Sequence, residues 1–162
     1  MLAVTRHTTG PVDMTLGITL ADQKAIKAWA APRCDMGSIP ESAWALAVVE
    51  IETGTLRAAC ILYEVYKGEV DVHFASDGDR RWATRDILTA MFFYAFHHMD
   101  ARILKAVIAA RNVPALVMAL KSGWQVQGRV QGVLSGGADG ILLTLAEPDC
   151  VYLKGDDHGR QE

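Results

Sequence analysis

The stretch of residues 69–109 constrains the fold more than any other part of the sequence. Residues 69–75 alternate polar and apolar side chains and predict a strand, whereas residues 84–99 repeat apolar side chains at helical spacing. Residues 102–109 are apolar and partly β-branched, which indicates a buried strand. A strand, a crossover helix and a second strand at this spacing form a right-handed unit whose two strands are parallel. The sequence therefore predicts a sheet that contains a parallel pair.

The region before this unit predicts an antiparallel meander. Residues 44–52 and 56–66 are two candidate strands that lead into the strand at 69–75 through short glycine-containing turns. Both faces of the strand at 44–52 are mostly apolar, so we expect cover on both sides of the sheet. For Trp29 and Trp44 we favour core packing over a role in lining a site.

The N-terminal part predicts one helix and leaves the first strand open. Thr19 is a candidate N-cap, with Asp22 three residues later as in a capping box, and Pro32 ends the helix. The first strand lies either around Val4 or at residues 14–19.

The C-terminal third predicts a capped helix followed by a hairpin. Asn112 is a good N-cap for a helix that ends before Gly123. Strands at residues 124–131 and 140–146 flank a glycine-rich loop, and Gly128 is a candidate bulge.

Length and composition limit the classes of function. The 162 residues suffice for one domain, which we place at residues 1–153, with a polar tail at 154–162. With 51% hydrophobic and 22% charged residues, no long apolar run and no signal-peptide pattern, we expect a cytoplasmic protein without a membrane span. A net charge of −3 argues against bulk electrostatic binding to nucleic acid. The three cysteines have no metal or redox spacing, so we expect no metal site.

Two charged segments are candidate sites. Residues 79–85 carry three arginines just before a helix, where free N–H groups and the helix dipole favour an anion such as phosphate. An ordinary solvated loop is the alternative. On the preceding strand, Glu69, Asp71 and His73 share one face, which is either solvated or lines a cleft that holds a general base.

Two sequence motifs, together with the order of the predicted strands and helices, resemble those of the GNAT superfamily of N-acetyltransferases. N-x-x-A at residues 112–115, followed by K-S-G-W at 121–124, is similar to the family's N-x-x-A…K-x-G-F signature. R-x-x-A-x-R at 80–85 stands where the family has the pyrophosphate loop (Q/R)-x-x-G-x-(G/A). The resemblance implies an α/β (α+β) fold: a mixed, mostly antiparallel, twisted sheet with helices on both faces and a central parallel pair that splays apart. The segment 147–153 is similar to the end of GNAT proteins from tailed phages and prophages.

The resemblance also implies a site for acyl-CoA, generally acetyl-CoA, in the gap between the splayed strands. Backbone groups of residues 74–76 would pair with the pantetheine arm, N–H groups of the loop would hold the pyrophosphate, and Asn112 would lie near the arm. The implied cofactor-binding residues are Phe74, Ala75, Ser76, Arg80, Arg81, Trp82, Ala83, Thr84, Arg85 and Asn112.

Some positions depart from the family pattern. Ala83 and Arg85 replace two loop glycines, whose lack of a side chain lets the backbone approach phosphate closely. The family's general-acid tyrosine falls at Ala119, so water, Ser122 or Tyr94 would have to donate the proton.

The resemblance places the family's catalytic glutamate at about Asp71. His73 lies on the same strand face and competes for the role, because the intrinsic pKa of an imidazole is nearer neutrality. The catalytic candidates are therefore Asp71 and His73.

These features predict an acyl-CoA-dependent N-acyltransferase that moves an acetyl group directly to an amine, encoded by a phage or prophage and acting in the host cytoplasm. Residues 20–43 would form a lip that selects the acceptor. One alternative is a GNAT-fold factor that binds a host protein without catalysis, and another is a phage enzyme that modifies DNA bases. A homodimer is also expected from the resemblance.

Overall fold

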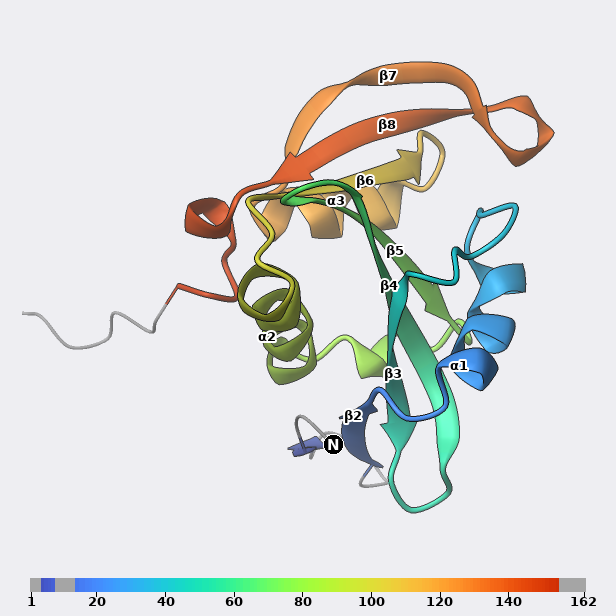
Figure 1. The fold of residues 1–162 in the computed structure, drawn as a ribbon, viewed down its shortest axis with the longest axis vertical. Helices are drawn as coiled ribbons and strands as arrows, with labels where there is room; N and C mark the ends of the chain where they lie inside the picture. Colours follow the sequence, from blue (N-terminus) through green and yellow to red (C-terminus); the bar gives the residue numbers. More distant parts are fainter. Residues whose placement is uncertain (1–3, 8–13, 155–162) are drawn as a thin grey trace, which may run out of the picture.

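The computed structural model describes residues 4–7 and 14–154, which form one eight-stranded sheet and its flanking helices (Figure 1). The strands are β1 (Val4–His7), β2 (Met14–Thr19), β3 (Trp44–Glu50), β4 (Thr55–Tyr66), β5 (Glu69–Ser76), β6 (Ile103–Ala109), β7 (Gln125–Leu134) and β8 (Ala138–Leu145). The α-helices are α1 (Gln23–Ala30), α2 (Arg85–Phe93) and α3 (Val113–Lys121). Shorter helical segments are η1 (Ala31–Arg33), η2 (Arg80–Trp82), η3 (Tyr94–His98), η4 (Ser135–Gly137) and η5 (Glu147–Asp149).

The strand order is β1-β2-β3-β4-β5-β6-β8-β7. Neighbouring strands are antiparallel except β5 and β6, which are parallel and are connected through α2. The predicted meander and the predicted parallel pair are thus confirmed. Both candidates for the first strand form, as β1 and β2, and a change of register at Gly128 confirms the predicted irregularity in β7.

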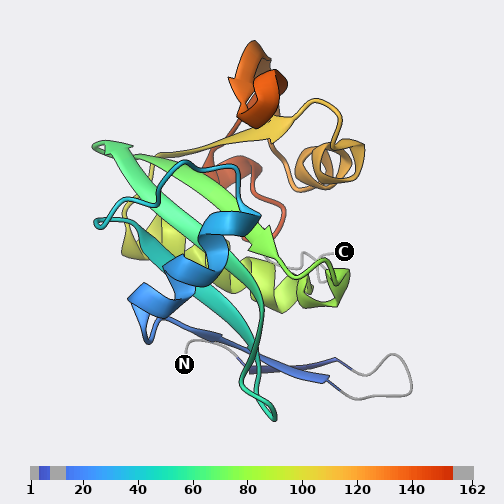
Figure 2. The same cartoon turned by 90° about the vertical axis from the view of Figure 1, so that its right-hand side faces the viewer.

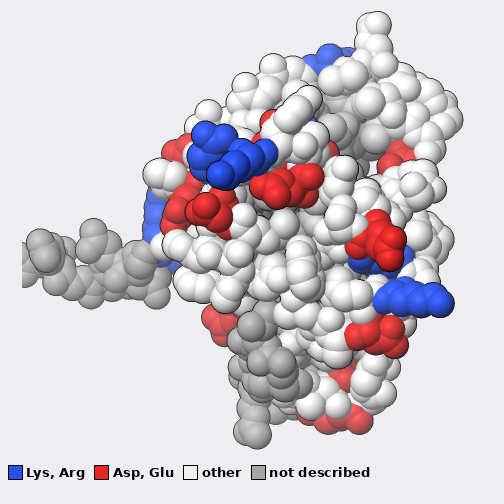
Figure 3. Space-filling model, viewed as in Figure 1, with Lys and Arg blue, Asp and Glu red and all other residues white. Residues whose placement is uncertain are grey.

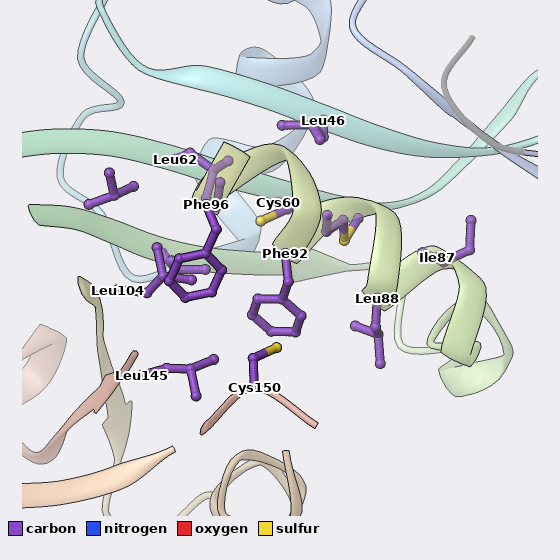
Figure 4. Packing of buried hydrophobic residues seen from close by; sticks show 14 of the residues in the cluster. Leu46, Cys60, Leu62, Ile87, Leu88, Phe92, Phe96, Leu104, Leu145 and Cys150 are labelled. Carbon is purple, nitrogen blue, oxygen red and sulfur yellow. The ribbon is translucent and has the colours of Figure 1, made fainter. Parts of the chain in front are cut away.

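Helices cover both faces of the sheet (Figures 1 and 2). On the face of α2 and α3, large buried side chains form the main core, among them Leu62, Phe92 and Phe96 (Figure 4). On the face of α1, a smaller core consists mostly of alanines, with Ile26 as one of its larger members. Strand β3 contributes Leu46 and Val48 to the first core and Ala45 and Ala47 to the second, as its two apolar faces predicted.

The start of α1 differs from the prediction. Thr19 is the last residue of β2, where it pairs with Ala47, so it is not available as the helix cap. Asp22 is the N-cap instead, and its carboxylate accepts a hydrogen bond from Ala25 N at 3.0 Å. The helix begins later than the local capping pattern predicts because β2 continues to Thr19 in its pairing with β3.

Two other predictions also need correction. The helix predicted over residues 84–99 begins as expected, with Thr84 as N-cap, but its last turn is a π-helical turn, η3. In this turn Met99 N donates to Tyr94 O at 3.1 Å, one residue wider than an α-helix allows. Trp44 is 46% exposed rather than buried, because it is the first residue of β3 and lies at the end of the covered part of the strand.

Candidate functional site

The parallel strands β5 and β6 separate after a short pairing. Their register ends at Asp71 and Lys105, although β5 continues to Ser76 and β6 to Ala109. Beyond this point β5 stays paired with β4, and β6 stays paired with β8. Each strand follows its own antiparallel neighbour, so a gap opens between them. The splayed parallel pair that the sequence predicted is therefore present.

A cavity of about 330 Å³ lies in this gap. Its walls come from β5, β6, α2, α3 and the residues just after it, the end of η1 with the two residues that follow, and the end of β7. The lining residues are Arg33, Cys34, Asp35, Val72, His73, Phe74, Leu88, Phe92, Ala106, Val107, Ile108, Asn112, Ala115, Met118, Ala119, Ser122, Trp124 and Leu134. These residues come from both layers that cover the sheet, so the cavity has walls on both faces.

Of the two candidate bases, only His73 lines this cavity. Burial lowers the pKa of the His73 imidazole below its ordinary value of 6.5, and the Asp71 carboxylate partly opposes that effect. His73 is therefore neutral at pH 7 and can accept a proton.

Asp71 has a different environment. Its carboxylate forms an ion pair with Lys105 Nζ at 3.1 Å, and the same ammonium contacts Glu69. These contacts raise the pKa of Lys105, chiefly through the hydrogen bond to Glu69. Asp71 thus neutralises a lysine on the neighbouring strand. This contact was missed in the sequence, because nothing in the pattern shows that Lys105 stands beside Asp71 before the parallel register is known.

The predicted pyrophosphate loop supplies fewer free donors than its sequence suggests. Arg81 donates several hydrogen bonds to Asp79, one of them at 2.8 Å, and they lower the pKa of the Asp79 carboxyl to about 2. The backbone N–H groups of Arg81, Ala83 and Thr84 donate to acceptors within the loop. Arg80 is exposed and makes no ion pair with any residue in the described ranges.

The other predicted cofactor residues take up distinct positions. Phe74 and Asn112 line the cavity, and Asn112 also caps α3 by accepting a hydrogen bond from Ala115 N at 3.3 Å. Trp82 is buried and stacks on Phe74, with ring centroids 5.9 Å apart. Ala75 packs in the smaller core on the face of α1. Ser76 ends β5, and none of the residues from Arg80 to Arg85 lines the cavity.

The lip predicted from residues 20–43 reaches the cavity through Arg33, Cys34 and Asp35. Burial raises the pKa of the Cys34 thiol, so it stays protonated at neutral pH. The Asp35 carboxylate accepts hydrogen bonds from Ser135 N, at 2.9 Å, and from Ser135 Oγ. We call this contact the latch, because it joins the lip to the tip of the β7–β8 hairpin beside the cavity. No sequence signal relates two residues so far apart in the chain.

Comparison with known proteins identifies the fold. No protein-family model and no curated protein matches the sequence. Among solved structures, a chimera of the spermidine N-acetyltransferase SpeG from Vibrio cholerae and hSSAT has a TM-score of 0.70 at 10% identity, covering 86% of this chain and 99% of that one. The ribosomal-protein-S5-alanine acetyltransferase from Vibrio fischeri has a TM-score of 0.57 at 15% identity, covering 67% and 63%. A GNAT-family acetyltransferase from Bacillus anthracis has a TM-score of 0.55 at 14% identity, covering 70% and 69%.

These likenesses show that the chain has the fold of the GNAT acetyltransferases, as the sequence motifs predicted. Within the described residues, no helix has the length and apolar character needed to span a membrane.

Proposed function

We propose that the protein is an acyl-CoA-dependent N-acyltransferase that uses acetyl-CoA and transfers the acetyl group directly to an amine. One observation carries the proposal: the cavity in the β5–β6 gap has walls from both faces of a GNAT-type sheet and a neutral histidine among its lining residues. We propose that the donor and the acceptor approach each other from opposite sides of the sheet. Fold by itself does not fix function, so the chemistry of this gap has to support the proposal.

The free edge of β5 suits the donor. Beyond Asp71, β5 has no strand partner on the side facing β6 within the described residues. Unpaired backbone groups along a strand edge bind extended chains that carry amides, as in strand addition. Phe74, Ala75 and Ser76 would hold the pantetheine arm here, with Asn112 near it. When bound, acyl-CoA supplies an activated thioester carbonyl.

The loop before α2 would hold the phosphates. Arg80 lies exposed in this loop, Arg85 is the first residue of α2, and the start of α2 adds a favourable dipole. Arg81, Trp82, Ala83 and Thr84 would contribute mainly by shaping this loop, since three of their N–H groups already have partners.

His73 is proposed as the general base. It would take a proton from the attacking amine, directly or through one water. Asp71 remains a candidate from the sequence, but it pairs with Lys105 and does not line the cavity.

The acceptor would enter beside the lip. Arg33, Asp35 and the latch give this entrance a mixed charge, which suits an amine that carries other polar groups. The similar structures include a spermidine acetyltransferase and a ribosomal-protein alanine acetyltransferase. Polyamines and peptide N-termini are therefore the first acceptors to screen.

Isothermal titration calorimetry with acetyl-CoA tests the proposal. We expect saturable binding that is strongly weakened in the double variant Arg81→Ala, Arg85→Glu. The control is Arg129→Ala, which removes an arginine that pairs with Asp139 on the β7–β8 hairpin. Absence of binding at high micromolar acetyl-CoA would overturn the acyltransferase proposal.

The occupied donors of the loop favour one alternative, a GNAT-fold factor that binds a host protein without catalysis. The same titration separates the two, because this factor does not require acetyl-CoA.

A DNA-modifying enzyme is less favoured. On the face of the molecule drawn in Figure 3, acidic and basic side chains lie side by side and form no continuous basic surface. Phage origin and a homodimer stay predictions, and light scattering checks the second.

A further inference from the structure

We propose that Tyr152, acting through Ser122, supplies the proton that the leaving thiolate needs. This inference rests on the proposed function. The observation behind it is a pair of hydroxyls 3.3 Å apart: Ser122 Oγ, from a residue that lines the cavity, and Tyr152 Oη behind it.

Ser122 has the position required of a donor. It lines the cavity from the end of α3, and it is the one polar residue in the buried class within the described part of the chain. Its hydroxyl donates to Met118 O at 2.7 Å. Because a serine hydroxyl has a single proton, Tyr152 is the donor in the contact between the two hydroxyls.

Tyr152 is held in place by contacts on several sides. Its ring stacks on Phe92, with centroids 5.6 Å apart, and its carbonyl accepts a hydrogen bond from Thr89 Oγ1 at 3.2 Å. The preceding Val151 N donates to Ser122 O at 3.1 Å. The segment after β8 is thus fixed against α2 and the end of α3, which orients the phenol toward Ser122.

Gly123 makes this docking possible. Its φ is 102°, and a side chain there would begin 2.0 Å from the carbonyl oxygen of Asp149. Only glycine allows the C-terminal segment to lie this close to the end of α3.

The other candidate donors fit less well. Tyr94 does not line the cavity and stacks on His98 instead. Asn112 offers only amide N–H groups, which do not act as acids, and Ala119 has no transferable proton. Cys34 lies on the lip, on the side of the gap where the acceptor would enter.

The proposed proton transfers balance. His73 accepts the proton that the amine releases as the carbon–nitrogen bond forms and the carbon–sulfur bond breaks. The Ser122 hydroxyl turns from Met118 O to the departing sulfur, which keeps the electron pair of the broken bond, gives the sulfur its proton and takes a proton from Tyr152. Tyr152, which is only half-buried, regains its proton from water, and His73 returns its proton to water.

The variant Tyr152→Phe tests the kinetic role, because it keeps the ring on Phe92 and removes the hydroxyl. With an amine acceptor found in the screen, we expect kcat to fall by about 10²-fold, the lower end of general acid–base effects, with acetyl-CoA affinity and thermal unfolding unchanged. Ser122→Ala should lose as much, Ser122→Thr should retain activity, and Tyr94→Phe should match the wild type. Unchanged kcat in Tyr152→Phe, or a loss in Tyr94→Phe alone, would overturn the inference.

A binding experiment tests the same contact without turnover. In protein carrying 13C at the tyrosine ζ carbon, the Tyr152 resonance is assigned by its loss in Tyr152→Phe. We expect it to shift with coenzyme A and to stay in place with the analogue whose sulfur is replaced by hydrogen, and Ser122→Ala should abolish the shift. If coenzyme A binds by calorimetry but no sulfur-dependent shift occurs, this inference fails and the proposed function stands. If coenzyme A does not bind, the proposed function fails.

Discussion

The two sides of the cavity are built in opposite ways. On the side of α2 and α3, aromatic rings interlock: Phe92 contacts both Trp124 and Tyr152 in the main core. On the side of α1, the core consists largely of alanines, and the cavity edge is closed by a side-chain contact between Asp35 and Ser135. The difference indicates a rigid wall and an adjustable wall, because polar contacts between loops can change without repacking the core. Under the proposed function, the rigid wall would face the donor and the adjustable wall the acceptor.

The largest expected effect is on catalysis, at the histidine between the two sides. His73→Gln should lower kcat/KM by about 10²- to 10⁴-fold, the range for loss of a general base. Because burial lowers the pKa of His73, the wild type should lose activity only as pH falls through a value below 6.5, and the variant should lack this acid limb.

A pH–rate profile with the screened acceptor measures this effect. Asp71→Asn is the comparison variant, and His98→Gln, outside the cavity, is the control. A larger loss in Asp71→Asn than in His73→Gln would reverse the assignment of the base.

The rigid wall predicts a large effect on stability. Phe92→Ala should lower the free energy of unfolding by about 3–5 kcal/mol, because the removed ring leaves a cavity among fixed neighbours. Its neighbour Phe93 is 48% exposed and is the matched control, for which a loss of less than about 1 kcal/mol is expected. Urea denaturation followed by circular dichroism measures both. Equal losses would mean that the aromatic wall is not tightly packed.

The adjustable wall predicts a smaller and selective effect. Ser135→Ala combined with Asp35→Asn should raise the acceptor KM by less than about tenfold, as expected for the loss of a neutral or singly charged hydrogen bond. The affinity for acetyl-CoA should not change. Hydrogen bonds from Ser135 lower the pKa of Asp35 below 3.8, so the latch is intact at neutral pH and is lost only as pH falls through that lowered value.

Steady-state kinetics and calorimetry on the same preparation distinguish the two walls. A matching loss of acetyl-CoA affinity would show that the latch also supports the donor side, and the comparison between the walls would then fail.

The smallest effect concerns the loop before α2. Asp79→Asn keeps the oxygen that caps η2 but removes the charge that neutralises Arg81. Acetyl-CoA affinity should rise by less than about fivefold, since exposed ion pairs are worth little. Calorimetry at two salt concentrations measures this, with a larger gain expected at low salt. A fall in affinity would mean that Arg81 needs Asp79 to hold its position.

Local patterns in the sequence determined most of the fold. The alternation in residues 69–75, the helical spacing after residue 84 and the cap at Asn112 predicted the parallel pair, α2 and α3 because each depends on neighbours within a few residues. The GNAT resemblance added the splayed gap. Local rules failed where a residue pairs with a strand that is distant in the sequence, as Thr19 pairs with Ala47 of β3.

The tertiary structure alone decided which side chains meet at the cavity. Lys105 reaches Asp71 only in the parallel register, Asp35 meets Ser135 only when the hairpin reaches the lip, and Tyr152 meets Ser122 only because the last segment lies across Gly123. These contacts join residues that are far apart in the chain, so no local pattern encodes them. They form because β5 stays paired with β4 while β6 stays paired with β8. The positions of the side chains around the gap therefore depend on where β5 and β6 separate.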